Sequence, residues 1–293
     1  MPGRGILYTR FAIGVVAASF GAILVRYAGE ATPLTIAAWR LGLTAIVLLP
    51  VALAHKTLRS SSRRELLWSM ASGVALAFHF VLWITSLRYT SVASSVLFVT
   101  THPIFVGLGA HFVLRERAGR GLIVGIGLAV FGGVLIGFGD LRIGGDALRG
   151  DLLALAGGLA VSIYFLIGRR VRQTMPLIDY ITVTYGTAAV LVLASCLIVR
   201  SPLGGFSPST YLFLVLVALI PQLIGHSTFN WALKHLPASK VSVMILGEPI
   251  GSTLLAVLFF SEMPTWLNGI GAVIILLGIY LSLTTKEASD GEV

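Results

Sequence analysis

Ten apolar runs of about bilayer-crossing length follow one another along this chain, and they constrain its fold more than any other feature. A helix needs about 20 residues to cross the hydrocarbon core of a membrane. The runs cover residues 6–26, 34–54, 67–87, 92–113, 121–139, 151–169, 178–199, 210–233, 239–260 and 265–284. Because the connections between them are short, we predict an all-α membrane protein with ten transmembrane helices and no separate soluble domain.

The amino-acid composition supports a membrane protein. Of the residues, 56% are hydrophobic and 11% are charged, whereas a soluble domain carries about 25% charged residues. The formal net charge of +9 does not indicate a nucleic-acid partner, because the basic residues lie between apolar runs rather than on one face. Cys196 is the single cysteine, so no internal disulfide can form. The composition therefore predicts the lipid bilayer as the partner.

The two halves of the chain repeat one another. Residues 99–117, VTTHPIFVGLGAHFVLRER, return in altered form as residues 245–263, ILGEPIGSTLLAVLFFSEM. At an offset of 146 the matches are Pro103 with Pro249, Glu116 with Glu262, Gly125 with Gly271, and Gly132 with Gly278. At an offset of 143 they are Gly14 with Gly157, Arg26 with Arg169, and Pro33 with Pro176. Because the first run belongs to this duplication, we expect it to be a helix of the mature protein rather than a signal peptide.

The basic residues predict the orientation of the chain. Lys and Arg concentrate in cytoplasmic connections. Of the 21 Lys and Arg residues, Arg40 falls inside a predicted helix and fifteen fall on the side of the N-terminus. The five on the opposite side are Arg26, Arg88, Arg142, Arg149 and Arg200. Both termini are therefore predicted to be cytoplasmic.

Five helices in each repeat, an odd number, place the two halves in opposite orientations. The first repeat covers residues 1–147 and the second covers residues 148–293. Inverted repeats are typical of secondary transporters, in which the substrate binds near the membrane midplane where the repeats meet. The alternative is a duplicated structural membrane protein, and we favour transport.

The recurring proline, the acidic residue after it and the glycine-rich run that follows resemble the drug/metabolite transporter superfamily, in its ten-helix branch with two EamA-type domains. Within that branch the chain looks like the YddG-type aromatic amino-acid exporters. The resemblance covers both halves. It implies a basket-like helical bundle around a central cavity, and export of aromatic and related amino acids across the bacterial inner membrane. Gly247-Glu248-Pro249 matches the usual form, whereas Thr101-His102-Pro103 places a histidine where the second half has a glutamate.

Polar side chains deep in a membrane helix usually face the bundle interior or a cavity. His79 lies about 12 residues into its run, or roughly 18 Å along the helix, and Trp83 and Ser86 share its face. This face suits an amino-acid-sized ligand, although the histidine could instead bond a neighbouring helix while the tryptophan packs. Tyr164 lies in a run that the family uses for its cavity, and His102 lies near the middle of its own run. We predict that these five side chains, together with Glu248, bind substrate.

The two internal prolines remove a helix hydrogen bond and free a carbonyl, at Val99 and at Ile245. Pro103 and Pro249 could therefore expose carbonyls to substrate, act as hinges or simply kink the helices. His226 and Asn230 are an i, i+4 pair that could form either an inner gate or a packed interhelical contact.

Glu248 and Arg40 are charges of opposite sign inside predicted helices. Glu248 could attract an ammonium group, carry a coupling proton or serve as a structural partner. Arg40 lies close enough to the outer surface to extend toward it, and we predict a structural role for it.

Several other chemistries lack support in the sequence. The histidines show no metal-ligand spacing, the glycine-rich segment near 125–133 has no P-loop lysine, and no Ser/His/Asp set stands out. We therefore predict no cofactor, no metal and no enzymatic activity. The rivals to amino-acid export are a cationic multidrug exporter, a phosphorylated-metabolite exchanger, and a membrane enzyme or scaffold. The sequence leaves energy coupling and oligomeric state open.

Overall fold

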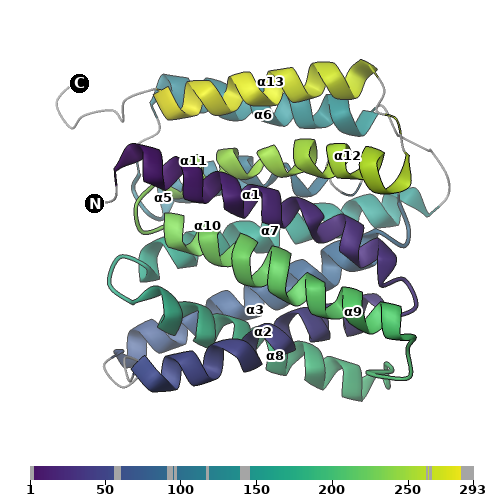
Figure 1. Cartoon of the computed structure of the whole chain (residues 1–293). Helices are drawn as coiled ribbons and strands as arrows, with labels where there is room; N and C mark the ends of the chain where they lie inside the picture. The colour runs from purple at the N-terminus through teal and green to yellow at the C-terminus, as the bar shows by residue number, and fades with distance from the viewer. Residues whose placement is uncertain are drawn as a thin grey trace.

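The structure is a computed structural model that describes residues 3–55, 61–90, 95, 98–116, 119–138, 146–261, 263 and 266–284. Every regular element among these residues is helical (Figure 1). In chain order they are α1 (Arg4–Tyr27), α2 (Pro33–His55), α3 (Arg63–Ser86), α5 (His102–Phe112), α6 (Arg120–Phe138), α7 (Ala147–Val171), α8 (Leu177–Ile198), α9 (Pro208–Val217), the π-helix η2 (Ala218–His226), α10 (Ser227–Ala232), α11 (Ala238–Ile245), α12 (Gly247–Phe260) and α13 (Trp266–Thr284).

Seven helical stretches in the described part of the chain are long and apolar enough to cross a membrane. They are Gly5–Tyr27, Pro33–Ala54, Arg63–Ser86, Ala147–Val171, Leu177–Ile198, Pro208–Ala232 and Ala238–Phe260. Two shorter apolar helices, Arg120–Leu135 and Gly269–Thr284, coincide with two further predicted runs. Of the predicted 92–113 run, the regular helix described is α5. The all-helical membrane fold is therefore confirmed, while the count of ten spans stays a prediction.

Some residues used in the sequence analysis lie outside the described ranges. Glu262, the predicted counterpart of Glu116, is one of them. The others are the basic residues Lys56, Arg59, Arg117, Arg142 and Lys286.

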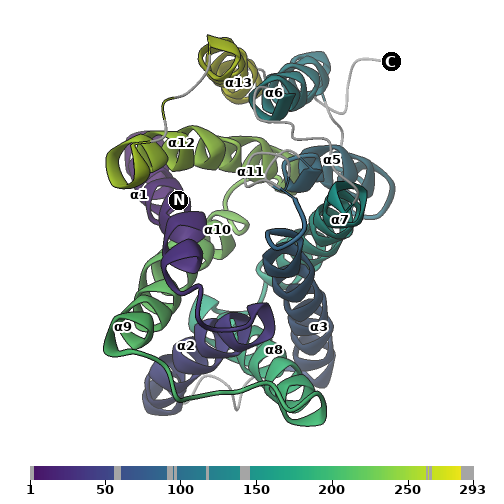
Figure 2. The same ribbon diagram turned by 90° about the vertical axis from the view of Figure 1, so that its right-hand side faces the viewer.

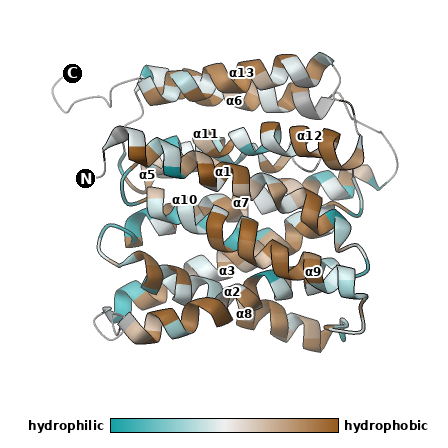
Figure 3. Cartoon of the chain, in the orientation of Figure 1, coloured by the Kyte–Doolittle hydropathy of each residue, from teal (hydrophilic) through white to brown (hydrophobic). Residues whose placement is uncertain are grey.

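The helices form a ring with one pair of helices beside it. Figure 2 shows α1, α2, α3, α7, α11 and α12 arranged around a central axis, with α6 and α13 paired outside the ring. Apolar residues run along α9, α12 and α13 (Figure 3). Large apolar side chains on several helices are exposed, including Phe112, Ile198 and Leu258, each more than 70% exposed. Such a surface is suited to lipid rather than water.

Glycines allow α6 and α13 to pack with their backbones in direct contact. A Cβ atom on Gly132 would lie 2.5 Å from the carbonyl oxygen of Gly271, and one on Gly125 would lie 2.7 Å from that of Gly278. Neither position therefore has room for a side chain. Small residues commonly permit such close approach between membrane helices.

The two prolines expected inside helical runs lie next to helix boundaries in the structure. α11 ends at Ile245 and α12 begins at Gly247, so that Leu246 separates them. In the first half, α5 begins at His102 and Pro103 occupies its first turn, where a missing backbone N–H costs little. The freed carbonyl of Val99 lies 3.1 Å from Nδ1 of His102. Both prolines therefore stand at the beginning of a helix rather than within one.

Candidate functional site

A cavity lies within the ring, among side chains from both halves of the chain. The volume of the cavity that the centres of water molecules can occupy is about 60 Å³. A single water needs roughly 10–15 Å³ on the same measure. Its lining residues are Ala18, Gly21, Ala22, Arg40, His79, Phe80, Trp83, Val99, Thr100, His102, Val161, Phe165, His226, Phe229, Ile245, Glu248, Pro249 and Ser252. The cavity is thus large enough for several waters or a small solute, and it combines aromatic rings with both signs of charge.

Aromatic and imidazole rings form one wall of the cavity. The rings of His79 and Trp83 are nearly parallel, with an interplanar angle of 2° and centroids 6.2 Å apart, as their i, i+4 spacing on α3 permits. The ring of His226 lies 5.2 Å from that of Phe80. Nδ1 of His79 lies 2.9 Å from the carbonyl oxygen of Gly157, a contact that fixes the ring orientation. His79 therefore bonds a neighbouring helix and also lines the cavity, which combines both readings of the sequence.

Arg40 does not extend toward the outer surface, and that expectation is wrong. Its side chain is 2% exposed and lines the cavity. Two contacts hold it there: Nε donates to Oε1 of Gln222 at 2.8 Å, and the guanidinium carbon lies 3.9 Å from the centroid of the Phe80 ring. A cation over an aromatic face is electrostatically favourable. The side chain is therefore drawn inward by partners on α3 and η2.

Gln222 owes its position to an irregular helix. The chain from Pro208 to Ala232 changes from α9 to the π-helix η2 and then to α10, and Pro221 lies inside the π-helical segment. Proline removes one helix hydrogen bond, and π-helical turns occur often at functional sites. This segment brings both Gln222 and His226 to the cavity region.

Glu248 enters the cavity from the first turn of α12, beside Pro249. The partial positive charge of a helix N-terminus favours an acidic residue in that turn. The backbone carbonyl of Glu248 accepts a hydrogen bond of 3.3 Å from Oγ of Ser19, which ties the start of α12 to α1. His102, the residue that occupies the corresponding place in the first half, also lines the cavity.

His226, a cavity-lining residue, has a ring nitrogen without a protein partner among the described residues. Nδ1 of His226 is buried and makes no hydrogen bond within the described part of the chain. Buried polar atoms are nearly always paired with protein or ordered water. The arrangement suits water or a polar ligand at this side of the cavity.

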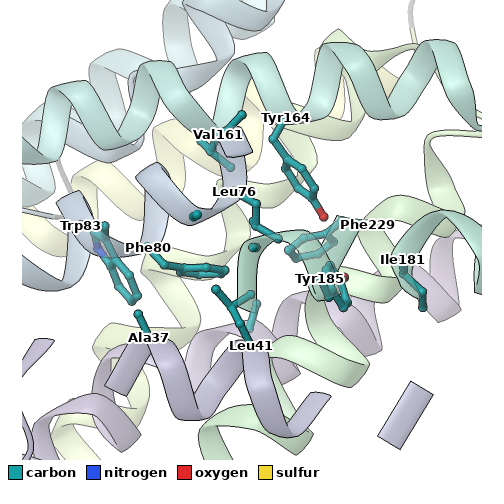
Figure 4. Close-up of a cluster of buried hydrophobic side chains, with 14 of the residues drawn as sticks. Ala37, Leu41, Leu76, Phe80, Trp83, Val161, Tyr164, Ile181, Tyr185 and Phe229 are labelled. Atoms are coloured by element: carbon teal, nitrogen blue, oxygen red, sulfur yellow. The ribbon is translucent and has the colours of Figure 1, made fainter. Parts of the chain in front are cut away.

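Next to the cavity, Tyr164 and Tyr185 approach Asn230. Figure 4 shows Tyr164 reaching from α7 toward Phe229 and Tyr185. Nδ2 of Asn230 donates to the hydroxyl oxygen of Tyr164, lies 3.1 Å from that of Tyr185 and lies 2.9 Å from the carbonyl oxygen of His226. All three side chains are fully buried. They form a buried hydrogen-bonded group beside His226, which lines the cavity.

That end of the bundle is fastened by a set that we call the end cluster, consisting of Glu116, Arg169 and Arg172. Nε of Arg169 lies 2.6 Å from Oε1 of Glu116, and Nη1 of Arg169 donates to the carbonyl oxygen of Leu233 at 2.8 Å. Nε of Arg172 donates to the carbonyl oxygen of Asn230 at 3.2 Å. The cluster thus joins the segment that follows α5 to the ends of α7 and α10, at the end of the bundle where α1 begins and α13 ends (Figure 1).

The structure brings many of the predicted site residues together, but not all of them. Seven of the predicted residues line the cavity, namely Arg40, His79, Trp83, His102, His226, Glu248 and Pro249. Those that do not are Ser86, Pro103, Tyr164 and Asn230. Ser86 instead donates to the carbonyl oxygen of Trp83 at 2.6 Å and lies 2.6 Å from the hydroxyl oxygen of Ser95.

Sequence reasoning missed Gln222 and the three phenylalanines at 80, 165 and 229. An amide inside an apolar run was a usable signal for Gln222, because polar groups at that depth need partners. The phenylalanines gave no signal, since an apolar residue is equally common in the core and on the lipid face. Among the described residues, no group of three or more His, Cys, Asp or Glu could hold a metal ion.

The all-helical fold and a partly open cavity that combines apolar and aromatic side chains with both signs of charge fit a membrane protein that surrounds a small solute. The EamA-like transporter family matches residues 4–138 and again residues 148–284, and the chain belongs to this family. The uncharacterized transporter YwfM of Bacillus subtilis (strain 168) is 26% identical over 94% of this chain and 93% of its own length. The uncharacterized transporter YyaM of the same organism is 25% identical over 86% of this chain and 84% of its own length.

More distant relatives extend the comparison. Solute carrier family 35 member G1 of Homo sapiens is 22% identical over 94% of this chain and 77% of its own length. One solved crystal structure superposes with a TM-score of 0.80 over 96% of this chain and 97% of its own, at 21% identity. That likeness shows the fold alone. The family and the names of its members indicate a multi-pass membrane transporter of a small molecule rather than an enzyme.

Proposed function

We propose that the protein is a secondary transporter that exports aromatic and related amino acids, or similar small amphipathic metabolites, by alternating access. Two inverted five-helix repeats, residues 1–147 and 148–293, would rock about the cavity. The protein would lie in the bacterial cytoplasmic membrane with both termini in the cytoplasm. The observation that carries this proposal is the relation between the cavity and the sequence repeat.

The packing of α6 against α13 supports an internal two-fold axis. The repeat pairs Gly125 with Gly271 and Gly132 with Gly278, but the contacts are crossed: Gly125 meets Gly278, and Gly132 meets Gly271. Such exchange of partners is the mark of a two-fold contact, in which residue i meets j and j meets i. The pattern is expected if the second repeat is inverted relative to the first.

The cavity itself supports the same axis. Twelve of its eighteen lining residues form six pairs at the repeat offsets of 143 or 146. The pairs are Ala18 and Val161, Ala22 and Phe165, Phe80 and His226, Trp83 and Phe229, Val99 and Ile245, and His102 and Glu248. Corresponding positions of both repeats therefore face one space, which is where inverted-repeat transporters bind substrate.

The character of the lining favours an amphipathic solute. Six aromatic or imidazole rings from α3, α7, η2 and α10 offer a surface for an apolar or aromatic body, namely those of His79, Phe80, Trp83, Phe165, His226 and Phe229. Arg40, His102 and Glu248 offer polar contacts. A ligand pocket is usually built in this way, with many apolar contacts and a few placed polar groups.

A cationic multidrug exporter is the second candidate, and Glu248 beside the aromatic rings favours it. Arg40 in the same cavity opposes it, because a cationic ligand would approach a buried guanidinium. A phosphorylated metabolite would need paired cations, whereas Arg40 is the single Lys or Arg in the lining and shares it with a carboxylate.

Transport from liposomes tests the proposal. Vesicles with and without the purified protein are loaded with labelled phenylalanine or tryptophan, and release is followed over time. We expect faster release with the protein, and release reduced by about tenfold in Trp83→Ala because an aromatic contact is lost. Trp266→Ala is the matched control, since Trp266 is 73% exposed and outside the cavity. Equal release of phenylalanine and of tryptophan from both kinds of vesicle would refute the proposal.

A further inference from the structure

We propose that Arg40 binds the carboxylate of a zwitterionic substrate and Glu248 binds its ammonium group, so that the cavity selects α-amino acids by both charges at once. This inference rests on the proposed function and assigns its specificity to two residues. The sequence predicted a structural role for Arg40 and placed Glu248 among the substrate-binding residues, without deciding whether it attracts an ammonium group, carries a proton or is a structural partner. The geometry points to a shared role for the two charges.

Arg40 is held in place by contacts that leave most of its donors unused. The side chain of Arg40 makes a single hydrogen bond within the described residues, from Nε to Oε1 of Gln222 at 2.8 Å. The face of the guanidinium rests on the ring of Phe80. A guanidinium presents five N–H donors in a planar fork that matches a carboxylate. With Nε and one face fixed, the terminal Nη groups are oriented in advance.

Space beside those groups is kept open by a glycine. A Cβ atom on Gly21 would lie 3.9 Å from Nη1 of Arg40, and Gly21 is itself a lining residue. A larger side chain at this position would occupy the volume that a carboxylate needs. The small residue therefore preserves access to the fork from the cavity.

Glu248 faces the same cavity from another side. α2, which carries Arg40, and α12, which carries Glu248, lie on opposite sides of the ring (Figure 2). No hydrogen bond joins the Glu248 carboxylate to another side chain in the described ranges, and no ion pair joins it to Arg40 there. The cavity thus separates a cation from an anion instead of letting them neutralise each other.

A zwitterionic ligand would offset the free energy that it costs to bury Arg40 and Glu248 apart from each other. Charges removed from water are unfavourable unless a partner of opposite sign is near. A bound α-amino acid would pair with both residues, whereas an amine or a carboxylic acid would pair with one and leave the other unmatched. The corresponding position to Glu248 in the first repeat is His102, so the two-fold relation of the cavity is broken at one of the charges. That asymmetry gives the substrate a single orientation.

The test compares three labelled compounds with the same aromatic body in liposomes that contain the full chain: phenylalanine, phenethylamine, which lacks the carboxylate, and 3-phenylpropionate, which lacks the ammonium group. We expect the wild type to transport phenylalanine best. Arg40→Gln should reduce kcat/KM for phenylalanine by about 10- to 100-fold while that for phenethylamine is maintained or rises. Glu248→Gln should do the same to phenylalanine while 3-phenylpropionate is maintained or rises.

Two further variants guard against effects of folding. Arg172→Gln removes an arginine of equal burial outside the cavity, so the ratios among the three compounds should stay at their wild-type values. Gln222→Leu removes the positioning residue of Arg40. It should raise KM for phenylalanine and leave KM for phenethylamine unchanged, and it serves if Arg40→Gln does not fold.

The outcomes separate this inference from the proposed function. Wild-type vesicles that transport none of the three compounds would overturn amino-acid export, and the inference with it. Transport of phenylalanine by the wild type, with equal losses for all three compounds in Arg40→Gln, Glu248→Gln and Gln222→Leu, would overturn the charge assignment alone. Reciprocal changes in selectivity would support it.

Discussion

Arg40 and Arg172 are buried to the same extent, at 2% exposure, yet they lie in two regions that use a guanidinium differently. Arg172 belongs to the end cluster, where Nε and Nη1 donate to the carbonyl oxygens of Asn230 and Met175. Arg40 belongs to the cavity and spends one hydrogen bond on Gln222. Burial alone therefore does not distinguish a structural charge from one that is available to a ligand.

The difference lies in which groups complete the hydrogen bonds. The partners of Arg172 are backbone carbonyls at the end of α10 and in the turn after α7, groups that lack helical partners of their own. In the cavity the partners are side chains on one side of the guanidinium and open space on the other. We conclude that the end cluster fastens helices together, and that the cavity keeps polar groups ready for solute.

The largest expected effect is on stability, from Arg172→Gln. The substitution removes charge-assisted bonds to two buried carbonyls, and we expect the free energy of unfolding to fall by about 2–3 kcal/mol. Arg40→Gln should lower the free energy of unfolding by less, because it removes one charge-assisted hydrogen bond, to Gln222, together with a charge that has no ion-pair partner in the described residues. Unfolding by SDS titration in mixed micelles measures both. A greater loss for Arg40→Gln would contradict the comparison.

The next effect is on transport, from His226→Phe. Because Nδ1 of His226 has no protein partner, a ring of similar shape without the nitrogen should leave the free energy of unfolding unchanged or raise it slightly. Transport of phenylalanine should nevertheless fall by about tenfold, through loss of a polar contact to solute or water. A destabilised protein with normal transport would place His226 among the structural residues.

Much of the fold could be predicted from the sequence because its signals are local and strong. Apolar length predicted the positions of the seven helices long enough to cross a membrane, and a helix boundary lies beside each of the prolines at 103 and 249. The repeat offset matched Gly125 with Gly271 and Gly132 with Gly278 as equivalent positions, but it predicted neither that their helices pack on each other nor that the contacts would be crossed. Which glycine meets which depends on the relative placement of two distant helices, which a single chain does not encode locally.

The candidate site was predicted in part, and the errors share a cause. His79, Trp83 and Glu248 were identified because a polar or amphipathic side chain at depth stands out from an apolar run. Arg40 was misplaced because its distance from the membrane surface suggested an easy route outward. Its actual direction depends on Gln222 and Phe80, on two other helices. A π-helix around Pro221 supplies the first of these, and no spacing rule indicated it.

A smaller effect is expected from Glu116→Gln in the end cluster. Glu116 and Arg169 are each 20% exposed, so water and salt screen the pair, and the loss should be about 0.5–1 kcal/mol. The difference in stability between Glu116→Gln and the wild type should become smaller in 1 M salt. A double-mutant cycle with Arg169→Gln isolates the pair. A coupling energy that does not change with salt would show that the contact is shielded as fully as that of Arg172.

The smallest effect on stability is expected from a substitution at Glu30, between α1 and α2. Its carboxylate is exposed but accepts several hydrogen bonds, and the groups of the end cluster also make several. The backbone N–H of Ser207 donates to Oε2 of Glu30 at 3.0 Å, and this bond, with those from the Thr210 and Ser207 hydroxyls, lowers the pKa of Glu30 below its ordinary value of 4.5. A lowered pKa means that the folded state favours the ionised form. The stabilisation is therefore complete above pH 4.5 and is lost as the pH falls through the lowered pKa. Glu30→Gln should lower Tm slightly at pH 7, and the Tm values of the two proteins should converge as the pH falls below the lowered pKa of Glu30. Because water competes for every bond, a Tm difference as large as that of Arg172→Gln would show that partners alone, without burial, suffice to make a polar group structural.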